Sequence, residues 1–472
     1  MHSVPPESCL ESRGKWFNTA LLSVLFCVAA LLLSQSGHCL QGSQAAAWPD
    51  PLVMQSGETV HNRDDFEKLR RPEILRLLEE NVYGKTPSSS LPVRVLKTEV
   101  DVHALHGLAR RTQITLAAGK NDERKWHLLQ YMPANARGPV PIFVGLNFDG
   151  NQTVDEDPGI NINPVWVPDP ALGRLHLAKE LSRHVLRTPD TASRGAAASQ
   201  WQVEKIIARG YGIATVYGGD IEPDFLGGIG YGIRPLMFSG TQSLPAADDW
   251  GAIGAWAWGM SRIVDVLSND PTVDPKGFIA FGFSRFGKTA LWAAAQDKRF
   301  AAVISNESGQ AGATLSHRQI GEPIDHLMLA FPYWFCANYQ HYLGRVQSLP
   351  VDGHLLLSLI SPRPLYVASA ADDPFSDPEG EFLAAKTVSP VYALYGKTGI
   401  TNMNMPSLEH QLGDAVAYHV RLGAHDVTAY DWEQYLDFVD RQLKHAAIRP
   451  RSPSSSFRFA KPEFSHRVGG KQ

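Results

Sequence analysis

Cysteine is scarce in this chain of 472 residues, where only Cys9, Cys27, Cys39 and Cys336 occur. None of them belongs to a C-x-x-C pair, the spacing typical of a structural zinc site or a redox-active dithiol. The sequence therefore predicts no metal site, no disulfide framework and no cofactor. Cys336 lies in an aromatic stretch, and we expect it to be a small buried apolar residue.

An excess of charge of either sign is also missing. Lys and Arg number 44 and Asp and Glu number 48, the formal net charge is −4, and the sequence contains no long basic run. Nucleic acids and anionic membrane surfaces attract basic patches, so we expect no nucleic-acid partner and no stable membrane association. A composition of 44% hydrophobic and 19% charged residues excludes general disorder and indicates at least one large packed core.

The first forty residues have the pattern of an export signal. Arg13 and Lys15 precede an apolar run over residues 20–33, which is short for a membrane span but has the length of a signal-peptide core. We therefore expect residues 1–39 to form a signal peptide, with cleavage within residues 36–47, and the mature protein to be secreted or periplasmic. An uncleaved membrane anchor is the alternative interpretation.

The next part of the chain combines a helical pattern with strand patterns. Residues 40–90 form an N-terminal extension, in which acidic residues followed by apolar residues at helical spacing predict a helix over residues 64–82. Residues 93–131 contain alternating or β-branched stretches separated by turn residues. This second pattern predicts antiparallel strands.

A different pattern begins near residue 140. Short apolar runs alternate with helical segments such as Trp250–Leu267 and Thr289–Ala295, and the runs are Pro141–Leu146, Gly212–Tyr217, Phe278–Phe281, Ala302–Ser305 and Leu365–Ala370. Strands that are apolar on both faces and joined by helices are typical of a mostly parallel sheet covered on both sides. The sequence therefore predicts an α/β fold, arranged as a three-layer sandwich.

One catalytic domain is expected over residues 91–447, because no internal repeat or linker divides this region. Residues 150–205 and 219–247 are too long for ordinary connections, and insertions of this kind usually build a rim around a binding site. Residues 448–472 contain a run of Pro and Ser, from which we predict a mobile C-terminal tail.

The segment Gly277–Trp292 has the pattern of a strand, a tight turn and a helix, with Ser284 at the turn between Gly282 and Gly287. Small flanking residues allow the sharp reversal that exposes a nucleophilic hydroxyl above a sheet edge. The following amide, that of Arg285, would lie at a helix N-terminus and could stabilise an oxyanion. The second glycine comes one position later than in the G-x-S-x-G motif, so a plain strand-to-helix turn is the alternative.

A serine nucleophile needs a base, and the base needs a carboxylate that orients it. In this fold the order along the chain is nucleophile, acid, histidine, which makes His425, on a late loop, the candidate base. His419 alternates with apolar neighbours and is expected to be a core residue. The acid is either Glu307, after one predicted strand, or Asp373, after the next, and the general position in the fold favours Asp373.

Several of these stretches together resemble the bacterial glucuronoyl esterases, carbohydrate esterase family 15. The matching segments are Gly282–Lys288, Ser305–Gly309, Leu365–Ala370 and Gly423–Glu433, and the similarity covers roughly residues 90–445. A G-x-S-R-x-G-K turn is much more specific than a bare G-x-S-x-G. The resemblance implies an α/β-hydrolase fold and a serine esterase that hydrolyses the ester between (4-O-methyl)glucuronic acid of glucuronoxylan and an alcohol, such as one in lignin.

The resemblance also implies roles for the catalytic candidates. Ser284 would be the nucleophile that carries the acyl-enzyme, and His425 would be the base. The family's acid follows the strand after the nucleophile's helix, which ranks Glu307 first. Some bacterial members also have an acidic residue at the position of Asp373, so this carboxylate could share the role.

The predicted substrate ligands surround the same motif. Arg285 can add its charge to the oxyanion site and hold the carboxylate product, while Lys288 and Glu322 match the family's ligands of sugar hydroxyls. Phe375 occupies a position where family members often have a tryptophan, so this chain loses a donor and some contact area there. Trp334 either lines the cleft or belongs to the core.

Two other functions remain open at this stage. An acetyl or feruloyl esterase could use the same triad, although desolvating Arg285 and Lys288 beside a neutral acyl group would gain little. A secreted polysaccharide-binding protein on an inactive hydrolase scaffold is the other alternative, because a fold does not determine a function.

Overall fold

The computed structural model describes residues 48–88, 91–169 and 183–443. The predicted signal peptide, the whole of the predicted tail and residues 170–182 of the first insertion lie outside these ranges. Among the described helices, none is both long enough and apolar enough to cross a membrane. Cys336 is buried, as the sequence predicted.

The helix predicted over residues 64–82 is present as four consecutive helical pieces. They are α2 (Arg63–Asp65), η1 (Phe66–Arg70), α3 (Arg71–Leu78) and η2 (Glu79–Tyr83). The Asn62 side chain caps the first piece by accepting a hydrogen bond from the amide of Asp65. Phe66 and Ile74 are fully buried, so the N-terminal extension forms part of the main core.

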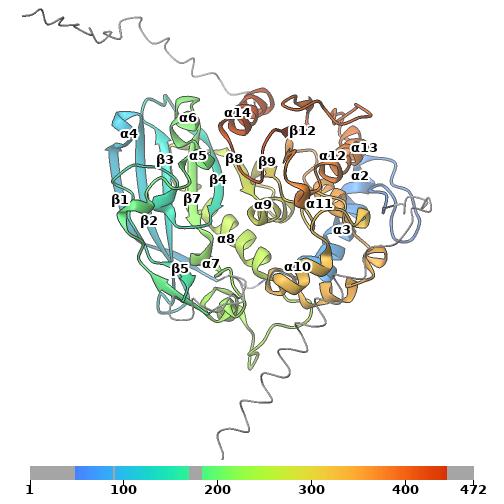
Figure 1. Cartoon of the computed structure of the whole chain (residues 1–472), viewed down its shortest axis with the longest axis horizontal. Helices are drawn as coiled ribbons and strands as arrows, with labels where there is room; N and C mark the ends of the chain where they lie inside the picture. The colour runs from blue at the N-terminus through green and yellow to red at the C-terminus, as the bar shows by residue number, and fades with distance from the viewer. Residues whose placement is uncertain (1–47, 89–90, 170–182, 444–472) are drawn as a thin grey trace, which may run out of the picture. The chain divides into compact units, whose positions relative to one another are not determined.

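The main sheet has ten strands in the order β1-β2-β3-β7-β4-β8-β9-β10-β12-β11. Figure 1 shows the antiparallel strands β1, β2 and β3 on the same side of the molecule as β7 and β4. The strands are β1 (Val93–His103), β2 (Ala109–Ala118), β3 (Arg124–Pro133), β4 (Val140–Asn147), β7 (Gly212–Tyr217), β8 (Val273–Phe283), β9 (Phe300–Asn306), β10 (Leu365–Ala370), β11 (Leu412–Gly413) and β12 (Val416–Arg421). From β7 to β12 all neighbours are parallel, whereas β1, β2, β3 and β11 pair antiparallel. The predicted antiparallel and parallel regions are both confirmed.

Helices cover both faces of this sheet, which confirms the three-layer sandwich. In β10, Leu365 and Val367 belong to one apolar cluster, and Tyr366 and Ala368 belong to the other, because successive side chains point to opposite faces. The first cluster includes side chains of α3, α8 (Ala252–Leu267), α9 (Arg285–Gln296), α11 (Gly353–Ser358) and α12 (Pro378–Thr387). The second includes side chains of α6 (Val203–Ala208) and α14 (Ala429–Leu443). The remaining α-helices are α4 (Ala104–Gly107), α5 (Ala198–Trp201), α7 (Gly218–Ile221), α10 (Ile324–Ala330) and α13 (Ser389–Ala393).

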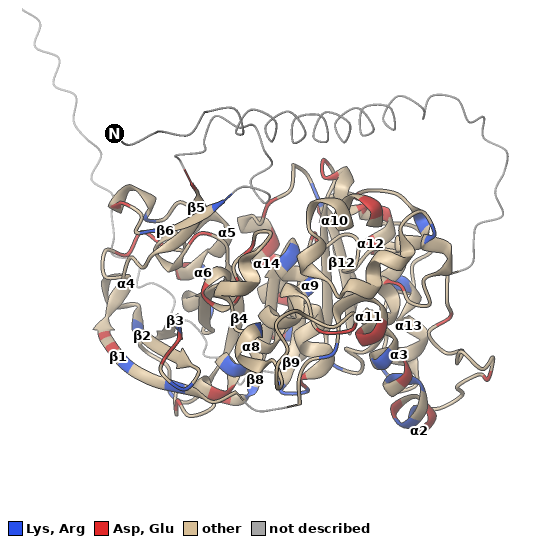
Figure 2. Ribbon diagram, turned by 90° about the horizontal axis from the view of Figure 1, so that it is seen from below, with Lys and Arg blue, Asp and Glu red and all other residues tan. Residues whose placement is uncertain are grey.

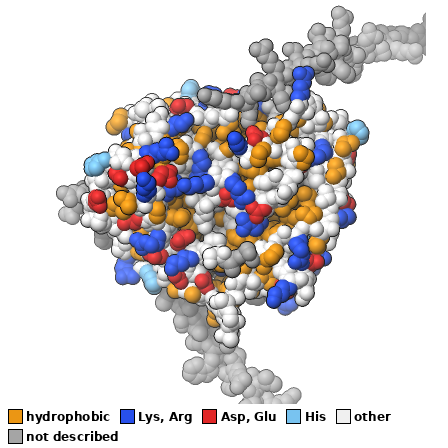
Figure 3. All heavy atoms as spheres, turned by 180° about the vertical axis from the view of Figure 1, so that it is seen from behind, with side chains coloured by type: hydrophobic (Ala, Val, Ile, Leu, Met, Phe, Trp, Pro, Cys, Tyr) orange, Lys and Arg blue, Asp and Glu red, His pale blue; other side chains and the backbone are white. Residues whose placement is uncertain are grey.

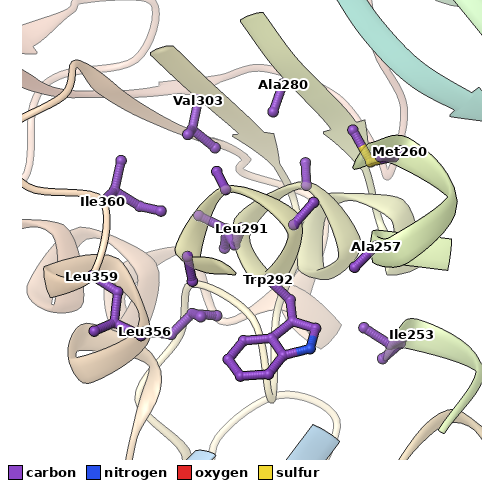
Figure 4. Close-up of a cluster of buried hydrophobic side chains, with 14 of the residues drawn as sticks. Ile253, Ala257, Met260, Ala280, Leu291, Trp292, Val303, Leu356, Leu359 and Ile360 are labelled. Atoms are coloured by element: carbon purple, nitrogen blue, oxygen red, sulfur yellow. The ribbon is translucent and has the colours of Figure 1, made fainter. Parts of the chain in front are cut away.

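Helix α9 is packed into the first cluster on several sides. Leu291 and Trp292 lie between α8 and the segment 356–360, next to β8 and β9 (Figure 4). The Trp292 ring also stacks on Tyr83, with 4.5 Å between the ring centroids. Burial of large apolar side chains on one short helix stabilises its position strongly, at about 1.5–3 kcal/mol for each side chain. The residue that precedes α9, Ser284, is therefore attached to a rigid element.

Strand register brings the candidate residues to one edge of the sheet. Phe283 of β8 pairs with Asn306 of β9, and Ala370 of β10 pairs with Arg421 of β12. The strands are parallel, so their carboxyl ends lie at the same edge, where ligands of open α/β sheets bind.

The first long insertion contains a two-stranded sheet of its own. It consists of β5 (Val165–Pro168) and β6 (His184–Arg187), which pair antiparallel and lie outside the main sheet (Figure 2). On the face of the molecule seen in Figure 3, Lys and Arg side chains are interspersed with Asp and Glu side chains.

Candidate active site

Ser284 lies between the last residue of β8 and the first residue of α9. Its backbone angles are φ 57° and ψ −128°, a conformation that is strained for a residue with a side chain and that occurs mainly at functional sites. The Ser284 amide donates a hydrogen bond of 2.9 Å to the carbonyl of Asn306 in the neighbouring strand. The sheet therefore holds the turn from one side and α9 holds it from the other.

The two glycines of the motif are required for different contacts. A Cβ atom on Gly282 would lie 1.9 Å from the carbonyl oxygen of Phe286, so the strand can pass this close to the helix only without a side chain. A Cβ atom on Gly287 would lie 2.9 Å from Cβ of Ser308, just after β9. The second glycine, which comes one position later than in the G-x-S-x-G motif, thus lies where α9 approaches the end of β9 and leaves no room for a side chain.

His425 lies on the loop between β12 and α14, and its Nδ1 atom faces two carboxylates. Nδ1 is 2.6 Å from Oδ2 of Asp373, with which it forms a hydrogen bond, and 3.1 Å from Oε2 of Glu307. The side chains of both acids are buried, whereas the imidazole is 41% exposed. The structure therefore brings together both acids that the sequence proposed, and the shorter contact is made by Asp373 although the resemblance ranks Glu307 first.

The electrostatics of the two acids differ. Burial alone would raise the pKa of Asp373, but hydrogen bonds from His425 and Ser376 outweigh it and lower the pKa to about 2. Burial raises the pKa of Glu307 to about 7 against the opposing effects of His425 and Arg421. Burial would lower the pKa of His425, but the two carboxylates outweigh it and raise the pKa to about 9. Asp373 is thus the permanently ionised partner.

A buried arginine that the sequence reasoning missed supports this arrangement. Nη2 of Arg421 lies 2.6 Å from Oε1 of Glu307 and donates hydrogen bonds to two carbonyls of the loop that carries His425. Nε of Arg421 donates to Asp431, at 2.8 Å. Asp431 also contacts Nε2 of His419, which is fully buried, as predicted for a core histidine. Arg421 could have been noticed in the sequence because it is a charged residue directly after the mostly apolar stretch 416–420.

Ser284, Arg285 and His425 line one pocket of about 290 Å³. The first insertion contributes Trp166, His184 and Gln200, the second contributes Asp224 and Phe225, and the remaining lining residues are Phe148, Asp149, Tyr217 and Phe283. Both insertions therefore border the candidate nucleophile. Among the hydrogen bonds of the described residues, none joins Ser284 Oγ to His425, and catalytic hydrogen bonds of unliganded enzymes are often long or poorly aligned.

Arg285 is the first residue of α9, in the turn where a helix supplies no acceptors for its amides. Its guanidinium forms an ion pair with Asp224 and lies 4.9 Å from the centroid of the Trp334 ring. Asp224 also accepts hydrogen bonds from Trp334 Nε1, at 2.7 Å, and from the Tyr333 hydroxyl, at 2.9 Å. The sequence reasoning missed Asp224 because no motif surrounds it. Trp334 is only 3% exposed and lies against Arg285, outside the pocket lining.

Among the predicted sugar ligands, Lys288 lies near this cation, with its Nζ atom 6.0 Å from the centroid of the Trp334 ring. The lining of the pocket beside Ser284 includes none of Lys288, Glu322 and Phe375. Lys288 is 4% exposed, and its Nζ atom donates a 2.5 Å hydrogen bond to the carbonyl of Ser308. Burial lowers the pKa of Lys288 to about 8, against the opposing charge of Glu322. The Glu322 amide donates a hydrogen bond of 2.9 Å to the carbonyl of Phe375, so these two residues are neighbours. The Phe375 side chain is 63% exposed.

Glu307, Asp373 and His425 also form the one cluster of histidine and acidic side chains, within the described ranges, whose spacing could hold a metal ion. Hydrogen bonds within the protein already explain why these groups lie together. Asp373 is bonded to His425 and Ser376, and Glu307 is paired with Arg421. The donor set therefore has the arrangement of an acid-supported base.

Comparisons with known proteins identify the family of this chain. The family model described as "Glucuronyl esterase, fungi" matches residues 244–396. Carbohydrate esterase MZ0003, from an unknown prokaryotic organism, is 40% identical over 400 residues, which cover 84% of this chain and 90% of that protein. The structure of a glucuronoyl esterase from Solibacter usitatus is 47% identical, with a TM-score of 0.78, and covers 84% of this chain and 98% of that one. A promiscuous CE15 esterase from a marine bacterial metagenome is 38% identical, with a TM-score of 0.75 and a coverage of 84% and 97%. These relatives show that this chain belongs to carbohydrate esterase family 15, the glucuronoyl esterases.

Proposed function

We propose that this chain is a carboxylic ester hydrolase that cleaves the ester between a glucuronic acid and an alcohol, with Ser284 as its nucleophile. The observation that carries the proposal is the shared pocket, in which a serine on a strained turn stands beside a histidine hydrogen-bonded to a buried, ionised Asp373. This is the arrangement of nucleophile, base and orienting acid that acyl transfer requires.

Catalysis would proceed in two displacements. His425 Nε2 accepts the proton of Ser284 Oγ as this oxygen attacks the ester carbonyl, and the resulting imidazolium then protonates the departing alcohol. Water, activated by the same imidazole, hydrolyses the acyl-enzyme and releases the uronic acid. Asp373 holds the Nδ1–H tautomer and stabilises the imidazolium, and Glu307 shares this role at the longer distance.

The negative charge that develops on the carbonyl oxygen would be stabilised at the start of α9. The Arg285 amide and guanidinium both belong to this region, and a helix N-terminus itself favours negative charge. Asp224 and Trp334 hold the guanidinium in place. Trp334 thus acts through Arg285 and does not itself touch the sugar.

Lys288, Glu322 and Phe375 would bind the sugar. A buried ammonium and a carboxylate can recognise vicinal hydroxyls by charge-assisted hydrogen bonds. The exposed ring of Phe375 offers an apolar surface for the sugar but has no N–H donor. We expect this difference to alter sugar affinity relative to members with a tryptophan there.

The substrate in nature would be a glucuronic acid ester of glucuronoxylan, with an alcohol of lignin on the other side. The polymer is found outside the cytoplasm, and residues 1–39 would direct the chain out of the cytoplasm to reach it. No cofactor is expected, because the reaction needs only water and the groups named above.

Hydrolysis rates on three substrates test the proposal. We expect rapid release of benzyl alcohol from benzyl glucuronate and little release of acetate or ferulate from acetylated or feruloylated xylan. Faster turnover of acetylated xylan than of benzyl glucuronate would contradict the proposal and favour an acetyl esterase.

A further inference from the structure

The ion pair between Arg285 and Asp224 lies inside the pocket that Ser284 lines. The two side chains are 21% and 22% exposed, so both face the space that a ligand would fill. The Oδ1 atom of Asp224 is bound by Trp334 Nε1 and by the Tyr333 hydroxyl, which are neutral donors from another segment. The position of this carboxylate therefore does not depend on Arg285 alone.

A carboxylate in this position is unexpected, because the proposed reaction produces a second one beside it. Hydrolysis adds water across the acyl–oxygen bond, and the alcohol takes up one proton. The uronic acid then loses its own proton to solvent. The substrate carbonyl carries no charge, whereas the product carries one negative charge next to the same guanidinium.

Asp224 acts differently on the transition state and on the product. In the transition state the negative oxyanion and the positive His425 imidazolium appear together, so the net charge of the pocket does not change. In the product complex His425 has returned to the protonation state that it had before the reaction, so the new carboxylate is not balanced by a new cation. Repulsion from Asp224 therefore acts mainly on the product.

We infer that Asp224 is a specificity-determining residue that makes the pocket distinguish the ester substrate from the acid product. This inference rests on the proposed function. Asp224 competes with the product carboxylate for Arg285 and also repels that carboxylate. In this way Asp224 speeds product release and limits product inhibition. The guanidinium still serves the oxyanion, because that charge forms together with a compensating cation.

Asp149 provides a matched control. It lines the same pocket and is exposed, and the ion pairs found within the described ranges do not include it. Asp149→Asn removes the same charge from the same pocket without touching Arg285.

Binding measurements on the Ser284→Ala protein test the inference without turnover. Calorimetry would measure the affinities for 4-O-methylglucuronic acid, its methyl ester and its neutral amide. These affinities would be compared between the Ser284→Ala protein and the double variant that also carries Asp224→Asn. We expect the acid to bind about tenfold more tightly after the change. The ester and the amide should keep their affinities within about twofold, and Asp149→Asn should change the acid affinity much less.

Three results would overturn the role of Asp224. These are equal changes for the acid and its two neutral analogues, weaker binding of the acid, or the same gain with Asp149→Asn. Turnover of benzyl glucuronate by the unmodified chain is measured in parallel. If turnover occurs, any of these results removes only the role of Asp224, whereas absence of turnover overturns the proposed function and this inference with it.

Discussion

The two sides of Ser284 have opposite electrostatic character. On the base side, His425 faces two buried acids, so negative charge lies beside the group that becomes positive in the proposed mechanism. On the oxyanion side, Arg285 lies among aromatic rings beside one partly exposed carboxylate. In the proposed mechanism, each charge that acyl transfer creates thus lies next to a preorganised charge of opposite sign. Such preorganisation is usually the largest source of transition-state stabilisation.

The two sides also differ in how they are built. The base side uses residues that come shortly after β9, β10 and β12. Arg421 joins Glu307 to the loop that carries His425. The oxyanion side depends on Asp224, from a long insertion, and on the short helical segment Pro332–Trp334. The sheet determines the first arrangement, whereas the second depends on how the rim folds. Four predictions, from the largest expected effect to the smallest, sharpen this contrast.

Removal of the nucleophile or the base should have the largest effect. Ser284→Ala and His425→Ala are each expected to lower kcat/KM for benzyl glucuronate by about 10⁴-fold, because the triad acts as a unit. His410→Ala, which changes an exposed histidine, is the control and should retain the normal rate. A near-normal rate in His425→Ala would show that another group is the base.

The two acids should contribute unequally. We expect Asp373→Asn to lower kcat by about 10²–10³-fold and Glu307→Gln by about tenfold, because Asp373 is ionised and closer to Nδ1. The double variant should be slower than either single one. Near-normal rates in both single variants would mean that the carboxylates substitute for one another, and a normal rate in the double variant would refute both assignments.

Loss of the buried cation should affect binding more than chemistry. Lys288→Met keeps the side-chain volume, and we expect KM to rise about tenfold with little change in kcat, because a charge-assisted hydrogen bond to the sugar is lost. Lys298→Met removes an exposed cation just beyond α9 and should leave both constants unchanged. A fall in kcat at constant KM would place Lys288 in the chemical step instead.

The pH profile should report the charge around His425. The free imidazole is the active form, and the carboxylates raise the pKa of His425 to about 9, so kcat/KM should increase up to that pH. Asp373→Asn removes one negative charge that favours the imidazolium, and the apparent pKa should therefore fall, by about one unit or more. An unchanged or higher apparent pKa in this variant would contradict the assigned electrostatics.

The same contrast explains what could be predicted from the sequence. Five strands of the parallel region, β4, β7, β8, β9 and β10, appear as apolar runs, and Ser284, Glu307 and Asp373 come shortly after three of them. His425 was predicted from the order of the triad residues along the chain. The fold class and the base side could therefore be predicted together. The position of β7 between β3 and β4 could not, because strand order depends on long-range pairing.

The oxyanion side was much less accessible to prediction. Asp224 is 61 residues from Arg285 along the chain, in a segment without regular periodicity. Trp166 and His184 reach the pocket from the other insertion. Such contacts depend on loop conformations, which neither hydrophobic spacing nor a motif encodes. Arg421 was missed for another reason, since a buried charge can be recognised only once its partners are known.

The central claim is that Ser284 is a nucleophile activated by His425. Labelling with a fluorophosphonate tests this claim most directly. Peptide mass spectrometry of the labelled wild-type chain should find the phosphonyl group on Ser284, at one equivalent per chain. Labelling should be absent in Ser284→Ala and slowed by orders of magnitude in His425→Ala. A folded wild-type chain that stays unlabelled, or a label on another residue that persists in Ser284→Ala, would contradict the account.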